Sequence, residues 1–228
     1  MIAYFHCNKP KNLSSVFHDY SCIAEGLQSL GATCYGNMDM CQKDVQGNFL
    51  IKREEHFDRK DADWIFFHQV IYRNGVSKAD ETIRTITDVS NRKYKTFFID
   101  SADGLRTPGF SKGARSCDVV LKSHYNRKYK YPSNFTPWQF GLSNRIINAV
   151  RPKLFYERDN SILVNFRAKH QLRDYVNTLI RPVIEKHYRW DDQTDSFTSD
   201  ELEGNDLLYW QQTGARHYPQ YYNKLSNT

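Results

Sequence analysis

Short apolar runs alternate with stretches of helical periodicity from the first residue of the chain, and this alternation restricts the fold more than any other feature. Residues 1–7 (MIAYFHC) suit a buried strand. Apolar residues then recur at helical spacing from Leu13 to Leu30, Gly31 is placed to end the helix, and residues 32–35 restart as a strand. Because a β-α-β opening is typical of a parallel sheet, we expect an α/β fold with a Rossmann-like sheet.

The same alternation continues beyond residue 60. A helix is predicted from Val76 to Val89, and Pro137 favours an extended conformation over residues 134–141. The turn after the first strand lacks a GxGxxG pattern, so no dinucleotide-binding fingerprint is present. Three further strands are predicted, near residues 63–69, 94–100 and 117–122.

The composition becomes mixed and charged between residues 142 and 160, which indicates a domain boundary. We therefore expect a Rossmann-like N-terminal domain over residues 1–150 and a second α/β domain over residues 161–228. Within the second domain, residues 190–204 are acidic and predict a solvated connecting loop.

The overall composition indicates a folded, basic protein. A formal net charge of +6 favours an anionic partner such as a nucleotide, a nucleic acid or an acidic glycan. Five cysteines, an odd number without a CxxC pair, predict reduced thiols rather than a disulfide framework or a zinc site. No apolar run approaches the roughly 18 residues of a membrane span, and we expect no signal peptide ahead of the first strand. We expect a cytoplasmic protein.

Titratable side chains stand where predicted strands end. His68 closes one strand, Asp100 and Asp103 follow another, and Lys122 closes a third. Ligands bind outside the carboxyl ends of strands in open α/β sheets, so these residues are candidates for a site. Two carboxylates at this spacing also suit a divalent cation or a sugar hydroxyl. The plainer alternatives are a structural histidine and an aspartate-capped turn.

A second concentration of charge lies at the start of the second domain. Residues 162–166 suit a buried strand, and apolar residues from Leu172 to Ile184 recur at helical spacing. The turn between them carries Arg167, Lys169 and His170, with Arg173 just inside the helix. Because a helix N-terminus attracts anions, a phosphorylated ligand is expected there. The alternative is a solvated basic turn.

Three passages resemble bacterial glycosyltransferases with two Rossmann-like domains (the GT-B architecture), of the family 1-like and exostosin-like kinds. The first passage is a strand that ends in aspartates, the second is a strand with a lysine and a proline-bearing return, and the third is the start of a donor-binding domain. They comprise residues 97–103, residues 118–125 with 136–141, and residues 162–167 with Arg216, His217 and 221–226.

The resemblance implies a hexosyl- or pentosyltransferase that moves a sugar from a nucleotide-sugar donor to a glycan or another hydroxyl acceptor. It places Asp100, Asp103 and His68 on the acceptor side. It implies that a group of cationic side chains binds the diphosphate of the donor, and that the reaction requires neither a metal nor a cofactor. Since GT-B donor domains continue well beyond the helix that residues 221–225 resemble, we expect an incomplete second domain, completed by further sequence or by a partner chain. The resemblance implies donor contacts by the following residues: Arg167, His170, Arg173, Arg216, His217 and Lys122.

Two other functions stay open. Residues 125–131 (YNRKYKY) interleave cations with aromatic rings, the pattern with which proteins bind single-stranded nucleic acid. In this alternative the chain is a basic nucleic-acid-binding module. The acidic stretch in the second domain interrupts the basic surface, which makes nucleic acid the less favoured partner. A degenerate scaffold without catalytic activity is the third reading.

Overall fold

The computed structural model describes residues 1–6, 16–37, 48–54, 56–102, 108–139, 141, 154–158, 161–164 and 175–192. The chain divides into two compact units, Met1–Asn144 and Arg145–Thr228. Each unit is described by itself below.

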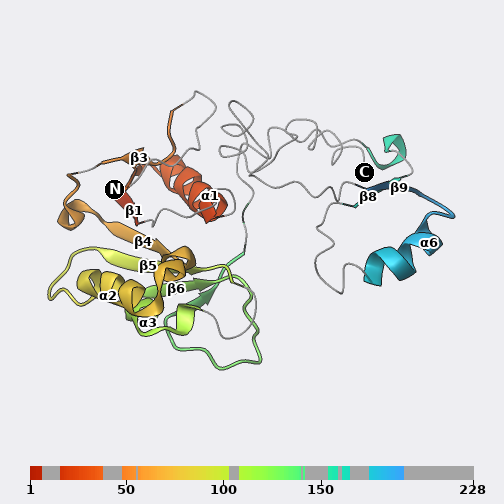
Figure 1. The fold of residues 1–228 in the computed structure, drawn as a ribbon. Coiled ribbons are helices and arrows are strands. Elements are labelled where there is room, and N and C mark those ends of the chain that lie inside the picture. Colours follow the sequence, from red (N-terminus) through yellow and green to blue (C-terminus); the bar gives the residue numbers. More distant parts are fainter. Residues whose placement is uncertain are drawn as a thin grey trace. The chain divides into compact units, whose positions relative to one another are not determined.

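The first unit is built on a parallel sheet, which confirms the predicted α/β, Rossmann-like fold (Figure 1). All of its strand pairs are parallel, and the strand order is β3-β2-β1-β4-β5-β6-β7. The strands are β1 (Ile2–His6), β2 (Thr33–Gly36), β3 (Lys52–Arg53), β4 (Trp64–His68), β5 (Lys95–Asp100), β6 (Val119–Lys122) and β7 (Phe135–Pro137).

Helices cover both faces of this sheet. α1 (Val16–Ser29) lies on one face, and α2 (Val76–Thr87) and α3 (Lys112–Ser116) lie on the other (Figure 1). Gly31, with a φ of 83°, follows α1 in the left-handed conformation, and the Ala32 N–H bonds back to the Leu27 carbonyl. The glycine therefore ends the helix as the sequence predicts.

Alternation along each strand divides the core into two layers. Phe5, Phe66 and Ile99 pack on the α1 face, whereas Phe67 and Phe98 pack on the α2 face. Since successive side chains of a strand point to opposite faces, this alternation also fixes the face that each strand-end residue occupies.

The strand order places a topological switch point between β1 and β4. From β1 the chain continues outward to β2 and β3 on one side, and from β4 it continues to β5, β6 and β7 on the other. In doubly wound sheets of this order, ligands bind in the crevice outside the carboxyl ends of the strands that flank the switch point. The candidate site is therefore sought there.

Two strands lie where the sequence gave no strand prediction. β3 has two residues and pairs with the end of β2, and β7 pairs with β6 within the segment predicted only to be extended. Pro137 in β7 is compatible with a strand at the edge of the sheet, where one side of the backbone needs no partner.

The second unit contains a parallel two-stranded sheet. β8 (Ser161–Val164) pairs with β9 (Arg189–Asp192), and between them a π-helical turn, η5 (Val176–Ile180), leads into α6 (Arg181–Ile184). A short 3₁₀ turn, η4 (Phe155–Glu157), precedes β8. Residues 190–192 were predicted to lie in a solvated loop, and this prediction is wrong. Their acidic composition does not encode the pairing with β8, which depends on residues almost thirty positions away.

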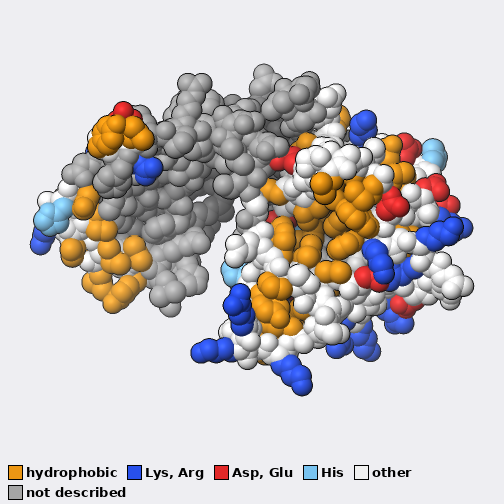
Figure 2. Space-filling model, turned by 180° about the vertical axis from the view of Figure 1, so that it is seen from behind, with side chains coloured by type: hydrophobic (Ala, Val, Ile, Leu, Met, Phe, Trp, Pro, Cys, Tyr) orange, Lys and Arg blue, Asp and Glu red, His pale blue; other side chains and the backbone are white. Residues whose placement is uncertain are grey.

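Figure 2 shows Lys and Arg side chains around the margin of the first unit, beside groups of hydrophobic side chains. Among the described residues, no helix is both long enough and apolar enough to cross a membrane.

Candidate functional site at the carboxyl edge of the sheet

Four neighbouring strands of the first unit end in polar side chains that are buried. His6, His68, Asp100 and Lys122 are the last residues of β1, β4, β5 and β6, with exposed fractions of 9%, 4%, 0% and 0%. Buried polar groups at a ligand-binding edge are either paired within the protein or available to a ligand. Their partners decide which role each can have.

Both ring nitrogens of His68 have partners. Its Nδ1 accepts a hydrogen bond from the Val70 N–H, as the cap of the 3₁₀ turn η2 (Gln69–Asn74). Nε2 therefore carries the proton and donates it to Asp19 Oδ2 of α1, 2.9 Å away, with Ser101 Oγ at 3.2 Å from the same nitrogen. In a serine–histidine–aspartate relay the hydroxyl and the carboxylate lie on opposite nitrogens. Here they share one, so this trio has the geometry of a structural clamp.

Asp100 and Lys122 form a buried pair. The Asp100 Oδ1 lies 3.7 Å from the Lys122 Nζ, and both side chains are fully buried. Asp100 also accepts the N–H groups of Ala102 and Gly109, and Lys122 donates to the Ala102 carbonyl. A Cβ at Gly109 would lie 2.4 Å from Asp100 Oδ2, so only glycine permits this approach. The pair ties the segment after β5 to the sheet.

The face of the sheet separates His68 from this pair. His68 is level with Ile99 of the α1 face, whereas Asp100 follows Phe98 of the α2 face by two residues. The sequence placed Asp100, Lys122 and His68 at one cleft. The structure brings the first two together and puts His68 on the other face of the sheet. Successive side chains of a strand point to opposite faces, and His68 is level with Ile99 rather than with Asp100.

His6 was missed by the sequence reasoning, although it closes β1 as His68 closes β4. Its Nδ1 is buried without a hydrogen-bond partner in the described part of the chain, as is Oε1 of Gln69. Burial, with a smaller contribution from the charge of Arg59, lowers the pKa of His6 to about 4. The imidazole is therefore neutral at pH 7. The Tyr20 hydroxyl of α1 donates to the carbonyls of His6 and Phe66. The helix α1 therefore covers β1 and β4, the strands that flank the switch point, on its own face of the sheet.

Comparison with models of known protein families, with curated proteins and with solved structures finds no match for this chain. The Rossmann-like class of the first unit therefore follows from the strand order of its parallel sheet.

The remaining predicted site residues lie outside the described residues, and their roles stay predictions. They are Asp103 on the acceptor side and Arg167, His170, Arg173, Arg216 and His217 on the donor side. Over the described ranges, His, Cys, Asp and Glu side chains form no group of three that would hold a metal ion. Burial raises the pKa of the Cys34 thiol to about 12, which makes this cysteine a core residue rather than a nucleophile.

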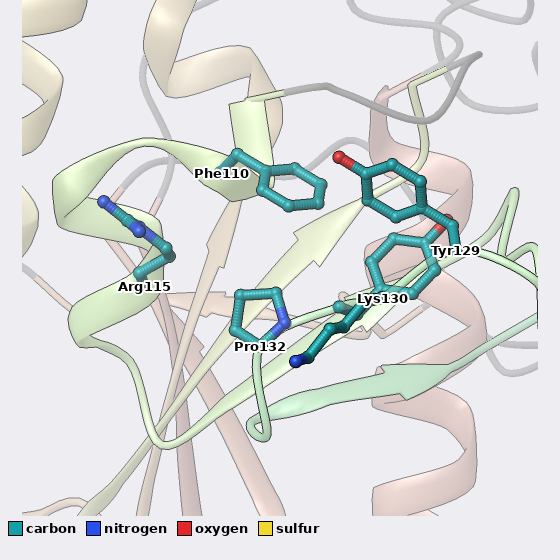
Figure 3. Close-up of a pocket in the computed structure, with 6 residues that line it drawn as sticks. Phe110, Arg115, Tyr129, Lys130 and Pro132 are labelled. Atoms are coloured by element: carbon teal, nitrogen blue, oxygen red, sulfur yellow. The ribbon is translucent and has the colours of Figure 1, made fainter.

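A separate opening lies between α3 and the loop that joins β6 to β7 (Figure 3). It has a volume of about 550 Å³. Its wall is aromatic, and two cations reach it from different elements, Arg115 from α3 and Lys130 from the loop. The lining residues are Phe110, Arg115, Tyr129, Lys130, Tyr131 and Pro132.

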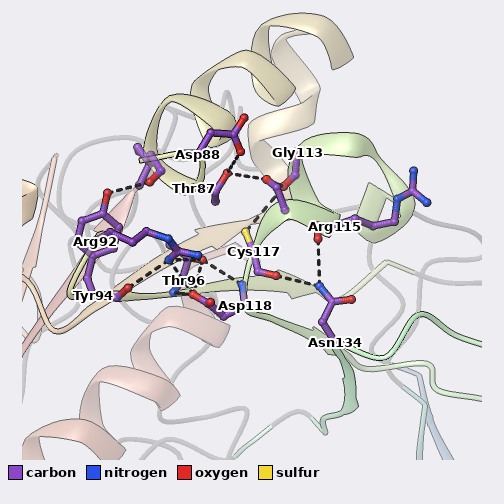
Figure 4. A network of polar contacts seen from close by, with 12 residues as sticks. Thr87, Asp88, Arg92, Tyr94, Thr96, Gly113, Arg115, Cys117, Asp118 and Asn134 are labelled. Carbon is purple, nitrogen blue, oxygen red and sulfur yellow. Dashed lines mark hydrogen bonds and ion pairs between the residues drawn. The ribbon is translucent and has the colours of Figure 1, made fainter. Parts of the chain in front are cut away.

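The opposite, amino edge of the sheet carries a network with a structural role (Figure 4). Asp118 Oδ2 accepts from the Thr96 N–H, the Thr96 hydroxyl and the Arg92 guanidinium, at 2.7, 2.9 and 2.7 Å. Burial alone would raise the pKa of the Asp118 carboxyl, but these hydrogen bonds hold it below its ordinary value. The network joins the starts of β5 and β6, away from the edge where ligands bind.

Proposed function

We propose that this protein is a glycosyltransferase that moves a sugar from a nucleotide-sugar donor to a hydroxyl acceptor. The succession of two α/β units along the chain supports the proposal, since glycosyltransferases of the GT-B architecture consist of two such domains in succession. In this proposal the first unit receives the acceptor at the switch point, and the second unit binds the donor through Arg167 and its cationic neighbours.

The observation that carries the acceptor side is the unpartnered Nδ1 of His6. A buried polar atom without a partner costs free energy, about 1–3 kcal/mol, which a ligand hydroxyl recovers by bonding to it. Gln69 Oε1 offers a second such atom. Both residues lie directly at the ends of the strands that flank the switch point, where a sugar hydroxyl would be recognised.

The reaction itself needs few groups. The acceptor oxygen forms a bond to the anomeric carbon of the donor while the bond from that carbon to the diphosphate breaks, and the diphosphate leaves with the electron pair. The hydroxyl proton passes to Asp103 or to the neutral imidazole of His6, and Arg167 stabilises the charge of the leaving diphosphate. Asp19, His68, Asp100 and Lys122 hold the edge in place and do not take part directly.

The test is release of nucleotide from a panel of UDP- and GDP-sugars by the full chain, with donor affinity measured in parallel. His6→Gln should lower kcat by roughly tenfold or more without changing donor affinity, since it alters the acceptor side. Arg167→Ala and Arg167→Lys should both weaken donor binding by roughly 1.5–3 kcal/mol, because lysine cannot form the planar fork of arginine. The exposed His56→Gln is the matched control. Absence of donor binding by the wild-type chain contradicts the proposal.

A further inference from the structure

The two unpartnered atoms at the switch point are both hydrogen-bond acceptors, and this restricts the ligand that can bind there. Oε1 of Gln69 is an amide oxygen, which only accepts. Nδ1 of His6 has no partner in the described part of the chain, and a buried N–H without an acceptor is rarer in proteins than an unused lone pair. The imidazole of His6, which is neutral at pH 7, therefore carries its proton on Nε2 and presents a lone pair at Nδ1.

The register of the sheet brings these two residues close to each other. His6 follows Tyr4 of the α2 face by two residues, and its ring centroid lies 5.6 Å from that of Phe67 on the same face. His6 is level with Phe67 of the neighbouring strand, and Gln69 comes two residues after Phe67. Because neighbouring strands lie roughly 4.8 Å apart and each residue advances roughly 3.3 Å, the two backbones are on the order of 8 Å apart. One monosaccharide can therefore contact both side chains.

Charged groups fit these two atoms less well than hydroxyl groups do. A carboxylate or a phosphate dianion offers only lone pairs, which two acceptors cannot bind. An ammonium group could donate to both atoms, but the positive charge of Arg59, in the 3₁₀ turn η1 (Arg59–Asp61), acts at His6 and disfavours a second cation. A hydroxyl group donates without carrying a charge. The two atoms therefore select neutral hydroxyl groups.

We propose that the switch point binds a neutral saccharide through two of its hydroxyl groups, one donating to His6 Nδ1 and the other to Gln69 Oε1. The inference rests on the proposed function for the role of this saccharide as the acceptor. Gln69 is then a specificity-determining residue, since it receives a hydroxyl proton in a hydrogen bond but has no part in proton transfer. Its side chain is flexible and only half-buried, so it can turn to admit the ligand.

The experiment titrates the full chain, without a donor, with the methyl glycosides of glucose, galactose and mannose. It follows the ¹⁵N resonances of histidine-labelled protein. At least one glycoside should bind and shift the Nδ1 resonance that disappears in His6→Gln. Deoxy derivatives of that glycoside that lack either of two hydroxyls should bind roughly three- to tenfold more weakly, the effect of one lost hydrogen bond. Inorganic phosphate and methylammonium, which test an anion and a cation at the same atoms, should leave the resonance in place.

Substitutions of Gln69 test the requirement for an acceptor. Gln69→Glu keeps an oxygen acceptor and should retain the glycoside affinity, whereas Gln69→Leu should weaken binding roughly three- to tenfold. Gln139→Leu removes the same amide from an exposed position, so this matched control should leave the affinity unchanged. Because Oε1 of Gln69 has no partner in the described part of the chain, Gln69→Leu should not lower the melting temperature. A lower melting temperature would assign Gln69 a structural role and overturn the inference.

The remaining outcomes separate this inference from the glycosyltransferase proposal. Absence of binding by every glycoside, an unmoved His6 resonance, equal affinity in Gln69→Leu, or a response of the resonance to inorganic phosphate overturns the inference. Nucleotide-sugar binding that persists in those cases leaves the glycosyltransferase proposal standing. Glycoside binding at His6 without any nucleotide-sugar binding contradicts the glycosyltransferase proposal and supports a neutral saccharide site at the switch point.

Discussion

Replacement of Asp100 by asparagine tests whether the buried pair holds the carboxyl edge together. The substitution keeps the size of the side chain but removes the charge opposite Lys122. At an effective dielectric constant of about 20, two unit charges 3.7 Å apart attract each other by about 4.5 kcal/mol. Loss of one partner leaves the other charge buried without compensation, which typically costs about 3–5 kcal/mol. We expect the free energy of unfolding of Asp100→Asn to fall by this amount.

The measurement is urea denaturation followed by circular dichroism, together with hydrogen exchange of the β5 and β6 amides, which reports on the first unit alone. Lys122→Met should destabilise to a similar extent. The double variant Asp100→Asn/Lys122→Met should be clearly more stable than the sum of the two losses predicts, because it leaves no buried charge unpaired. If Asp100→Asn unfolds like the wild type, or if the two losses simply add, the pair does not stabilise this edge.

Three further predictions concern other parts of the first unit. Gly109→Ala should lower the free energy of unfolding by roughly 1–3 kcal/mol, because its Cβ would lie 2.4 Å from a carboxylate oxygen of Asp100. Gly26→Ala, whose Cβ would meet nothing within 4 Å, should instead stabilise α1 by roughly 0.5–1 kcal/mol. Thermal melts that rank the two variants otherwise contradict this packing. The unfolded chain protonates His6 near pH 6.5 but the folded chain only near pH 4, so stability should fall by on the order of 3 kcal/mol as the pH drops through this range. His6→Gln should flatten that part of the pH profile, and an unchanged profile would show that the histidine is not buried. Asp118→Ala should lower the free energy of unfolding in urea by roughly 2–4 kcal/mol, because three hydrogen-bond donors lose their acceptor. Asp88→Asn, at an exposed ion pair, should change it by less than about 0.5 kcal/mol. Equal effects of the two substitutions would argue against a stabilising role of the network.

The polar edge illustrates how far residue patterns carry and where they stop. The ends of the strands were predicted from apolar runs, so the sequence alone placed His68, Asp100 and Lys122 at the carboxyl edge, as the structure has them. It did not predict their partners. Asp19 reaches His68 from α1, 49 positions away, and Gly109 reaches Asp100 across a connection that has no periodicity. Such contacts depend on where helices cross the sheet, which local patterns do not contain.

The basic and aromatic tract after β6 is a second case in which a residue pattern does not reveal the tertiary contacts of its side chains. Its interleaved pattern indicated stacking and phosphate contact, but it did not reveal that Tyr131 would be enclosed by its neighbours. It also gave no role to Phe110 and Arg115, which come from the preceding elements and complete the opening. Which rings of this tract pack against one another is therefore a property of the folded structure.

The sequence by itself determined the alternation of strands and helices, and with it a parallel α/β sheet, because apolar periodicity and chain connectivity are local properties. Tertiary structure decided the strand order, the switch point between β1 and β4, the pairing of β9 with β8, and the opposite faces of His68 and Asp100. These depend on contacts between residues that are distant in the chain. The free energy of such contacts comes from burial and pairing in three dimensions, which no single stretch of sequence specifies.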